Sequence, residues 1–96
     1  MPYVYACHRI DDYERWERHH EENGEARAAH GSLGSEAFRV RNDPTEVVVL
    51  IEIAEGRLEE TLDYYDSEAF RETLEAAGVR EVVEAEVLEK VHEQDA

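Results

Sequence analysis

The chain has 96 residues, which is the size of one domain and too short for two independent hydrophobic cores. Its 25 acidic residues outnumber its 10 lysines and arginines, which gives a formal net charge of −15. A chain this acidic repels phosphate groups, so nucleic acids and anionic membrane surfaces are excluded as partners. No apolar run reaches the length of a bilayer span, and the first residues lack the basic and apolar regions of a signal peptide.

The basic residues are nine arginines and one lysine, Lys90. Many surface carboxylates with almost no lysine are typical of proteins adapted to high salt, because at molar salt the Debye length falls to ~3 Å and repulsion between carboxylates is screened. We therefore expect a halophilic cytoplasmic protein, with an ordinary acidic protein as the alternative. The single cysteine, Cys7, cannot form an internal disulfide, as expected in a reducing cytosol.

The first half of the chain is expected to form a strand, a helix and a hairpin. Residues Pro2 to Ile10 are rich in Tyr and Val and predict a strand. Asp11 is the expected N-cap of a helix that runs to about Glu22, with Glu14 completing a capping box. A short turn over 25–30, a strand over 35–41, a turn over 42–45 and a strongly apolar strand over 46–53 follow.

The second half is expected to form a broken helix and one long strand. Leu58, Leu62 and Tyr65 recur at helical spacing, and Ser67 then begins a second helical piece that ends at Gly78. The final strand is predicted over 79–91, with Val83, Ala85 and Val87 on one side, and residues 92–96 are predicted to form a tail.

The predicted order is β-α-β-β-α-β, which is the split βαβ or ferredoxin-like arrangement of the α+β class. With right-handed crossovers the four strands lie in the order 4-1-3-2 in an antiparallel sheet, with the helices on one face. We expect one domain over residues 1–91 and a tail over 92–96.

The third predicted strand is apolar on both faces, and this predicts an interface. Val47, Val49 and Ile51 lie on one face, but Val48 and Leu50 lie on the other. Because the helices cover only one face of the sheet, the second face is expected to pack against a second copy of the chain in a homodimer. The alternative is that the C-terminal segment covers this face.

Several segments between Arg27 and Val79 carry a family resemblance: His30–Gly34, Phe38–Pro44, Val47–Glu52, Ser67–Phe70 and Ala77–Val79. Together with the predicted element order, they resemble the dimeric α/β-barrel superfamily, in particular its antibiotic-biosynthesis-monooxygenase-like branch. The resemblance implies a homodimer with a ligand cavity between each sheet and its helices. Members of this superfamily include cofactor-free monooxygenases that act on polycyclic aromatics, haem-degrading enzymes and proteins with no known activity.

The sequence departs from the monooxygenase-like pattern at two positions. The family often has Glu-x-Trp at the end of the third strand, but Glu52 is followed by Ile53 and Ala54. The family often has a histidine three residues before the serine of the second helix, and here that residue is Tyr64. A neutral phenol donates a hydrogen bond but is a poor base near neutral pH, so this replacement favours binding over proton abstraction.

Aromatic residues are the candidate ligand-binding groups. Trp16 and His20 share the inner stripe of the first helix. Trp16 is expected to form a stacking platform beside the titratable side chain of His20. The alternative is a core tryptophan beside a half-buried histidine. Tyr64 is the tyrosine expected at the cavity, and Tyr65 falls on the core stripe. The predicted ligand-binding residues are Tyr5, Trp16 and Phe70.

The arginines of the predicted hairpin are candidates for holding an anion. If the hairpin closes about Asp43 and Pro44, Arg41 lies opposite Glu46 and forms an ordinary cross-strand ion pair. Arg39 then lies opposite Val48 and has no directly opposed acid. It is therefore available for a ligand carboxylate or enolate, or for an ion pair across the dimer.

The catalytic hypothesis is a cofactor-independent monooxygenase that acts on a small aromatic or enolisable substrate. His20 would deprotonate the substrate, Arg39 or Tyr64 would hold the resulting anion, and O₂ would react with the carbanion directly. We expect no cofactor and no metal; a site assembled from His8, His20 and His30 is the less favoured alternative. A non-catalytic ligand-binding or stress-related barrel protein and a structural dimerisation module are the competing functions.

Overall fold

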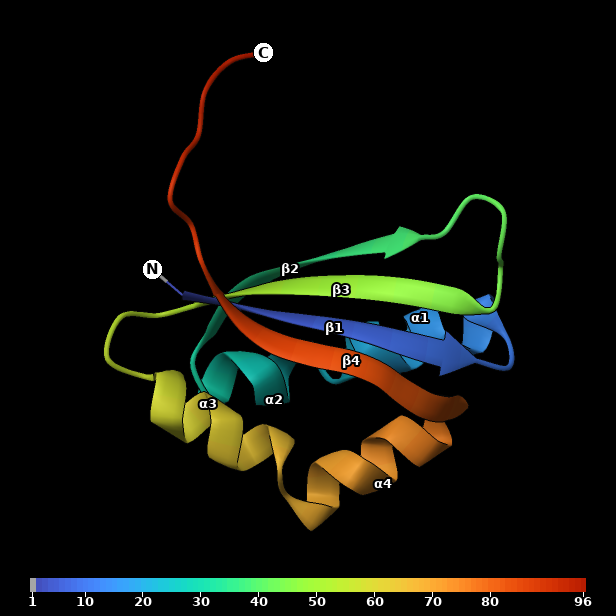
Figure 1. Cartoon of the computed structure of the whole chain (residues 1–96). Coiled ribbons are helices and arrows are strands. Elements are labelled where there is room, and N and C mark those ends of the chain that lie inside the picture. The colour runs from blue at the N-terminus through green and yellow to red at the C-terminus, as the bar shows by residue number, and fades with distance from the viewer. Residues whose placement is uncertain (1) are drawn as a thin grey trace.

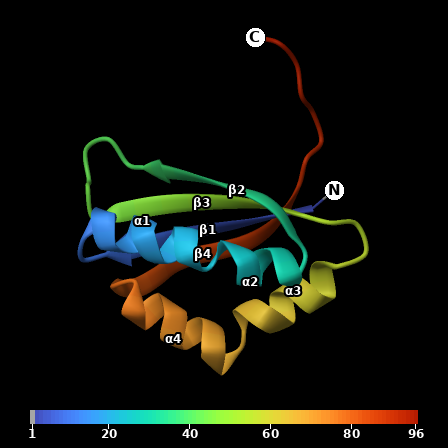
Figure 2. The same cartoon turned by 180° about the vertical axis from the view of Figure 1, so that it is seen from behind.

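The computed structural model describes residues 2–96. Four antiparallel strands form one sheet in the order β2-β3-β1-β4, and all four helices lie on the same face of it (Figures 1 and 2). This arrangement confirms the predicted ferredoxin-like α+β fold and its strand order. The strands are β1 (Pro2–Ile10), β2 (Ser32–Arg39), β3 (Glu46–Ile53) and β4 (Val79–Glu89), and the helices are α1 (Tyr13–Glu22), α2 (Gly24–Ala29), α3 (Leu58–Tyr65) and α4 (Glu68–Ala76).

The hydrophobic core lies between the sheet and the helices. Strand β3 alternates between buried and half-buried residues, with Val47, Val49, Ile51 and Ile53 buried on the side of the helices. Trp16 of α1 packs into the same core and is only 3% exposed. The alternation has the period of two that a strand with one face on a core requires.

The N-cap of α4 is the residue that the sequence predicts, and the N-cap of α1 is not. Ser67 caps α4, and its Oγ accepts a hydrogen bond from the Phe70 N–H at 3.2 Å, as predicted. The cap of α1 is Asp12 rather than Asp11, because the Asp12 carboxylate accepts from the Arg15 N–H. Asp11 pairs instead with Arg80 at the start of β4.

The β2–β3 hairpin has a different register from the predicted one. Strand β2 begins at Ser32 and ends at Arg39, and Arg39 lies opposite Val47 rather than Val48. The shift arises because two consecutive turns occupy the connection, with the Asp43 N–H bonded to the Val40 carbonyl and the Glu46 N–H bonded to the Asp43 carbonyl. The predicted pair between Arg41 and Glu46 is therefore wrong.

A bulge in β4 changes which of its residues face the helices. Cys7 of β1 pairs with Glu84, but the next residue, His8, pairs with Val82, so Val83 has no partner on β1. Val83 is predicted on the same side as Ala85, but Val82 lies there instead, and this side faces the helices. An unpaired extra residue of this kind exchanges the two faces of a strand from that point onward.

The face of the sheet opposite the helices is uncovered. Phe38 is 53% exposed there and Leu88 40%, close to half-buried Val48 and Leu50. The C-terminal residues leave the end of β4 and extend away from the sheet in both views (Figures 1 and 2). The described C-terminal segment therefore does not cover this face.

Candidate functional site

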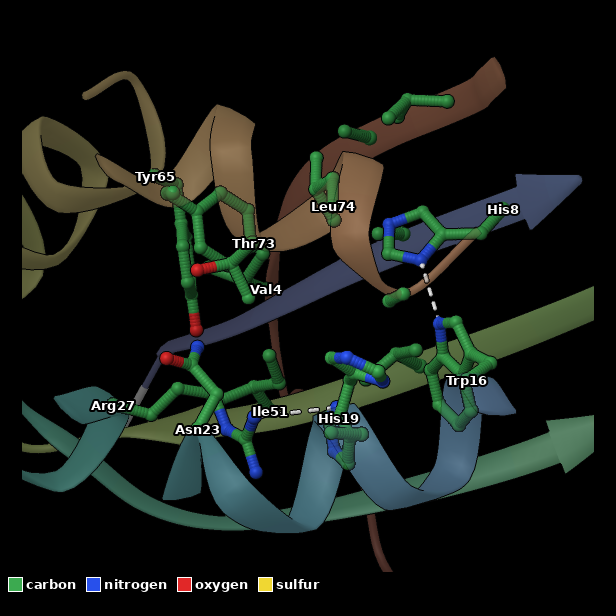
Figure 3. Close-up of a pocket in the computed structure, with 17 residues that line it drawn as sticks. Val4, His8, Trp16, His19, Asn23, Arg27, Ile51, Tyr65, Thr73 and Leu74 are labelled. Carbon is green, nitrogen blue, oxygen red and sulfur yellow. Dashed lines mark hydrogen bonds between the residues drawn. The ribbon is translucent and has the colours of Figure 1, made fainter. Parts of the chain in front are cut away.

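A cavity of about 170 Å³ lies between the sheet and the helices (Figure 3). The sheet contributes Val4 and Ile51 to its wall, and α4 contributes Phe70 and Leu74. These side chains form an apolar wall that suits a small, flat organic molecule. Phe70, predicted as a ligand-binding residue, lies at this cavity.

Trp16 and His20 form the part of the wall that α1 supplies. Their rings stack at 4.8 Å between centroids with an angle of 11° between the planes. The Trp16 Nε1–H donates a hydrogen bond to Nδ1 of His8 on β1 at 3.4 Å (Figure 3). The i, i+4 spacing on an amphipathic helix, which predicted a shared stripe for Trp16 and His20, also places both at the cavity.

Two of the histidines that line the cavity, His8 and His20, are neutral near neutral pH. Burial lowers the pKa of His8 to about 4, and burial together with the nearby Arg27 charge lowers the pKa of His20 to about 4. Arg27 Nη1 lies 3.2 Å from His20 Nδ1, and since an arginine only donates, Nδ1 accepts and the proton sits on Nε2. His20 Nε2–H then donates to Ser35 Oγ at 2.7 Å.

Arg27 is a charged residue of the cavity that the sequence pattern did not identify. It lies on the six-residue helix α2 and is only 8% exposed. Its position seven residues after His20 is two helical turns along, which places both side chains on one face if the helices are treated as continuous. The break at Asn23 and Gly24 concealed that spacing in the sequence.

The two adjacent tyrosines of α3 have exchanged roles relative to the prediction. Tyr65 lines the cavity, and its buried hydroxyl has no hydrogen-bond partner among residues 2–96. Burial raises the pKa of Tyr65 to about 12, so the phenol stays protonated. Tyr64 lies outside the cavity wall, where its ring stacks on His30 and its hydroxyl donates to Asn23 Oδ1 at 3.1 Å.

The remaining predicted site residues lie away from the cavity. The Arg39 guanidinium lies over the ring of Tyr13, 4.8 Å from its centroid. Tyr5 lies on the uncovered face of the sheet, opposite Leu50 of β3. The structure therefore brings Trp16, His20 and Phe70 together and separates Arg39, Tyr64 and Tyr5 from them.

Residues 2–96 contain neither a cluster of metal ligands nor a helix that could span a membrane. No three side chains of His, Cys, Asp or Glu in this range lie close enough together to hold a metal ion. The helices in the same range are all too short or too polar to span a lipid bilayer.

Comparison with solved structures identifies the same fold in other proteins. A proposed antibiotic biosynthesis monooxygenase from Bordetella bronchiseptica superimposes with a TM-score of 0.75 at 13% identity, covering 95% of this chain and 97% of that one. One from Caulobacter crescentus gives 0.70 at 15% identity, covering 95% and 90%, and one from Nitrosomonas europaea gives 0.67 at 9%, covering 96% and 100%. At these identities the likeness shows the fold.

Comparisons of the sequence itself gave no match. No protein-family model matches this chain. No curated protein matches it either. The chain therefore shares an architecture with monooxygenase-like proteins of the ferredoxin-like fold, while its cavity residues must be interpreted from their own chemistry.

Proposed function

We propose that this chain is a cofactor-independent monooxygenase that acts on a small aromatic or enolisable substrate in the cavity between sheet and helices. The observation that carries the proposal is the combination of an apolar wall with a stacked Trp16–His20 pair and hydrogen-bond donors at one end. The shared fold of the structures described as monooxygenases supports the same proposal.

The proposed reaction begins with removal of a proton from the substrate. His20 is neutral, as a base must be, but in the unliganded chain its low pKa makes it a weak base and its Nδ1 accepts a hydrogen bond from Arg27. A substrate oxygen that binds Arg27 would free Nδ1 to accept the proton, and the positive guanidinium would stabilise the enolate that forms. In this proposal Arg27 and Tyr65 take the anion-holding role that the sequence suggested for Arg39 or Tyr64.

Molecular oxygen then oxidises the substrate anion without a cofactor. The anion transfers electrons to O₂, and a C–O bond forms at the former carbanion. Overall, a methylene carbon loses two hydrogens and gains one oxygen atom, and the second oxygen atom leaves as water. The apolar wall contributes by keeping bulk water from the anion.

Oxygen consumption tests this proposal. A panel of hydroquinones and anthrones is offered to the wild-type chain in an oxygen electrode, and we expect uptake with at least one of them. His20→Ala should abolish turnover, and the matched change His92→Ala in the exposed tail should preserve it. Unchanged turnover in His20→Ala would eliminate His20 as the base.

A non-catalytic ligand-binding protein, including a stress-related one, is the second candidate. Its support is that both ring nitrogens of His20 already have partners and that Tyr64 occupies the position of the family's helix histidine. This candidate predicts ligand binding in the cavity without oxygen uptake from any compound of the panel. A purely structural dimerisation module would show neither ligand binding nor oxygen uptake. The presence of a cavity argues against this function.

We also propose that the chain works as a homodimer in a cytoplasm of high salt. The uncovered sheet face supports the dimer, because exposed Phe38 and Leu88 together with Val48 and Leu50 give it apolar area to bury. The excess of acidic residues supports the high-salt setting.

A further inference from the structure

Arg27 is a buried cation in a chain with a large excess of acidic residues. Twenty-five Asp and Glu residues are present, yet none of those in residues 2–96 approaches the Arg27 guanidinium within ion-pair distance. The ion pairs of the described chain use other basic residues: Arg9, Arg57, Arg71, Arg80 and Lys90. A buried charge without a counter-charge destabilises the folded chain, so a compensating group is expected.

The hydrogen bonds of Arg27 leave most of its donors free. A guanidinium carries five N–H donors, and within residues 2–96 the Arg27 side chain makes one hydrogen bond, from Nη1 to His20 Nδ1. That acceptor is neutral. Anionic acceptors bind a guanidinium more strongly than neutral ones, so a carboxylate can replace His20 as the partner.

Among the other polar groups at this cavity, His8 and Tyr65 each present a donor. His8 Nδ1 accepts from Trp16, which leaves the His8 proton on Nε2, and His20 Nδ1 accepts from Arg27. The Tyr65 hydroxyl stays protonated, has no partner and points toward the end of the cavity where Asn23 and Arg27 lie (Figure 3). A ligand that brings acceptor oxygens would satisfy Tyr65 and Arg27 together.

We propose that the cavity binds a small aromatic carboxylate, with the carboxylate on Arg27 and Tyr65 and the ring against Trp16 and Phe70. This inference rests on the proposed function, since it names the substrate class of the same cavity. A carboxylate compensates the Arg27 charge as soon as the ligand binds, before any enolate forms. The planar fork of the guanidinium matches the two oxygens of a carboxylate.

Calorimetric titration of wild-type protein with matched acids and amides tests the inference. The probes are benzoate against benzamide and 1-naphthoate against 1-naphthamide, in one KCl buffer. We expect each carboxylate to bind about ten- to a hundredfold more tightly than its amide, which is the range for hydrogen bonds to a charged group. Equal affinities, or tighter binding of the amides, would overturn the inference without the need for any variant.

Substitution of Arg27 tests the assignment of the residue. Arg27→Gln keeps a donor for His20 Nδ1 and removes the charge, and we expect it to lose the preference for carboxylates. Arg18→Gln makes the same change on the exposed side of α1 and should keep the preference. The melting temperature of the unliganded Arg27→Gln chain should equal or exceed that of wild type, because no uncompensated buried charge remains. A preference that survives in Arg27→Gln would overturn the assignment.

The two proposals fail in different experiments. Carboxylate preference without oxygen uptake from the panel would sustain the inference and reject the monooxygenase. Oxygen uptake with equal binding of acids and amides would sustain the monooxygenase and reject the inference.

Discussion

Burial of His8 makes the stability of the chain depend on pH. Its pKa in the folded chain is about 4, against 6.5 for an ordinary histidine. The unfolded chain therefore binds a proton that the folded chain does not bind between these values. The free energy of unfolding is therefore unaffected by His8 above about pH 6.5 and falls as the pH decreases toward 4, by roughly 3 kcal/mol at most. His20 acts in the same direction.

Urea denaturation near pH 7 and near pH 5, at constant high salt, measures this dependence. The wild-type chain should be less stable near pH 5. His8→Gln should show a smaller loss, and His92→Gln, in the exposed tail, should keep the full loss. A loss of the same size in all three chains would rule out His8 as the source.

The two adjacent tyrosines of α3 should respond to the same substitution with opposite signs. Tyr65→Phe removes a buried hydroxyl that has no partner, so the free energy of unfolding should rise by about 1 kcal/mol. Tyr64→Phe removes the hydrogen bond to Asn23 Oδ1, so it should fall by about 1 kcal/mol. Urea denaturation of the two variants in the absence of ligand makes the comparison. Changes of the same sign would contradict the assigned environments.

Sequence periodicity located part of the candidate site and missed the rest for a physical reason. Trp16 and His20 belong to one continuous helix, so their spacing gave their common face. Arg27 lies beyond the helix break at Asn23, so the spacing within the first helix does not include it. Tyr65 lies on an apolar stripe, which predicts a core position, but the same side of the helix faces the cavity. A stripe shows which side of a helix faces inward, but it does not show where the interior is empty.

At the scale of elements, the junction between α2 and β2 depends on close contact with α3. Gly31 has a φ of 113°, and a Cβ on it would lie 2.6 Å from Thr61 Oγ1. The Thr61 hydroxyl is buried and lies 2.6 Å from the His30 carbonyl oxygen, which ties α3 to the end of α2. The absence of a side chain at Gly31 therefore lets the two segments approach.

Alanine substitutions at two glycines separate backbone strain from this contact. Gly56 has a φ of 79° and open space where its Cβ would be, so Gly56→Ala should cost only the strain of about 1–2 kcal/mol. Gly31→Ala should cost roughly 1–3 kcal/mol more, because it adds a steric overlap with Thr61. The two free energies of unfolding are compared by urea denaturation. Equal costs would exclude the overlap at Gly31.

Element types and their order follow from the sequence more reliably than register does. Alternation and capping residues predicted the strands, the helices and the cap at Ser67. The register of β2 depends on the two consecutive turns that connect it to β3. The side of the sheet on which Val82 lies depends on the bulge in β4, which is defined by its pairing with β1. The alternation of apolar and polar residues within one strand does not predict how that strand pairs with its neighbour.

At the scale of the whole molecule, the proposed dimer and the proposed salt adaptation should be coupled. The uncovered face carries glutamates beside its apolar residues, including Glu36 opposite Leu50 and Glu86 opposite Tyr5. Two such faces repel each other in dilute buffer, and molar salt screens that repulsion. Association and folding stability should therefore both increase with salt.

Light scattering and thermal denaturation from dilute buffer to several molar KCl test this coupling. We expect the mass of a dimer in concentrated KCl and a melting temperature that rises with salt. Phe38→Glu should give a monomer in concentrated KCl, and Leu62→Glu, on helix α3, should remain a dimer. A monomeric wild-type chain in concentrated KCl would reject the dimer, and a melting temperature independent of salt would reject the adaptation.

The irregular outer strand β4 has a consequence for the kind of assembly that copies of this chain can build. A straight border strand can recruit a strand from another molecule, and that process continues without limit. Strand β4 has two register shifts against β1, and it carries Glu81, Glu84, Glu86 and Glu89. Both features oppose strand-by-strand growth at this edge of the sheet. The proposed dimer instead uses the broad surface of the sheet, where a two-fold arrangement would close on itself and give a particle of finite size rather than a fibre.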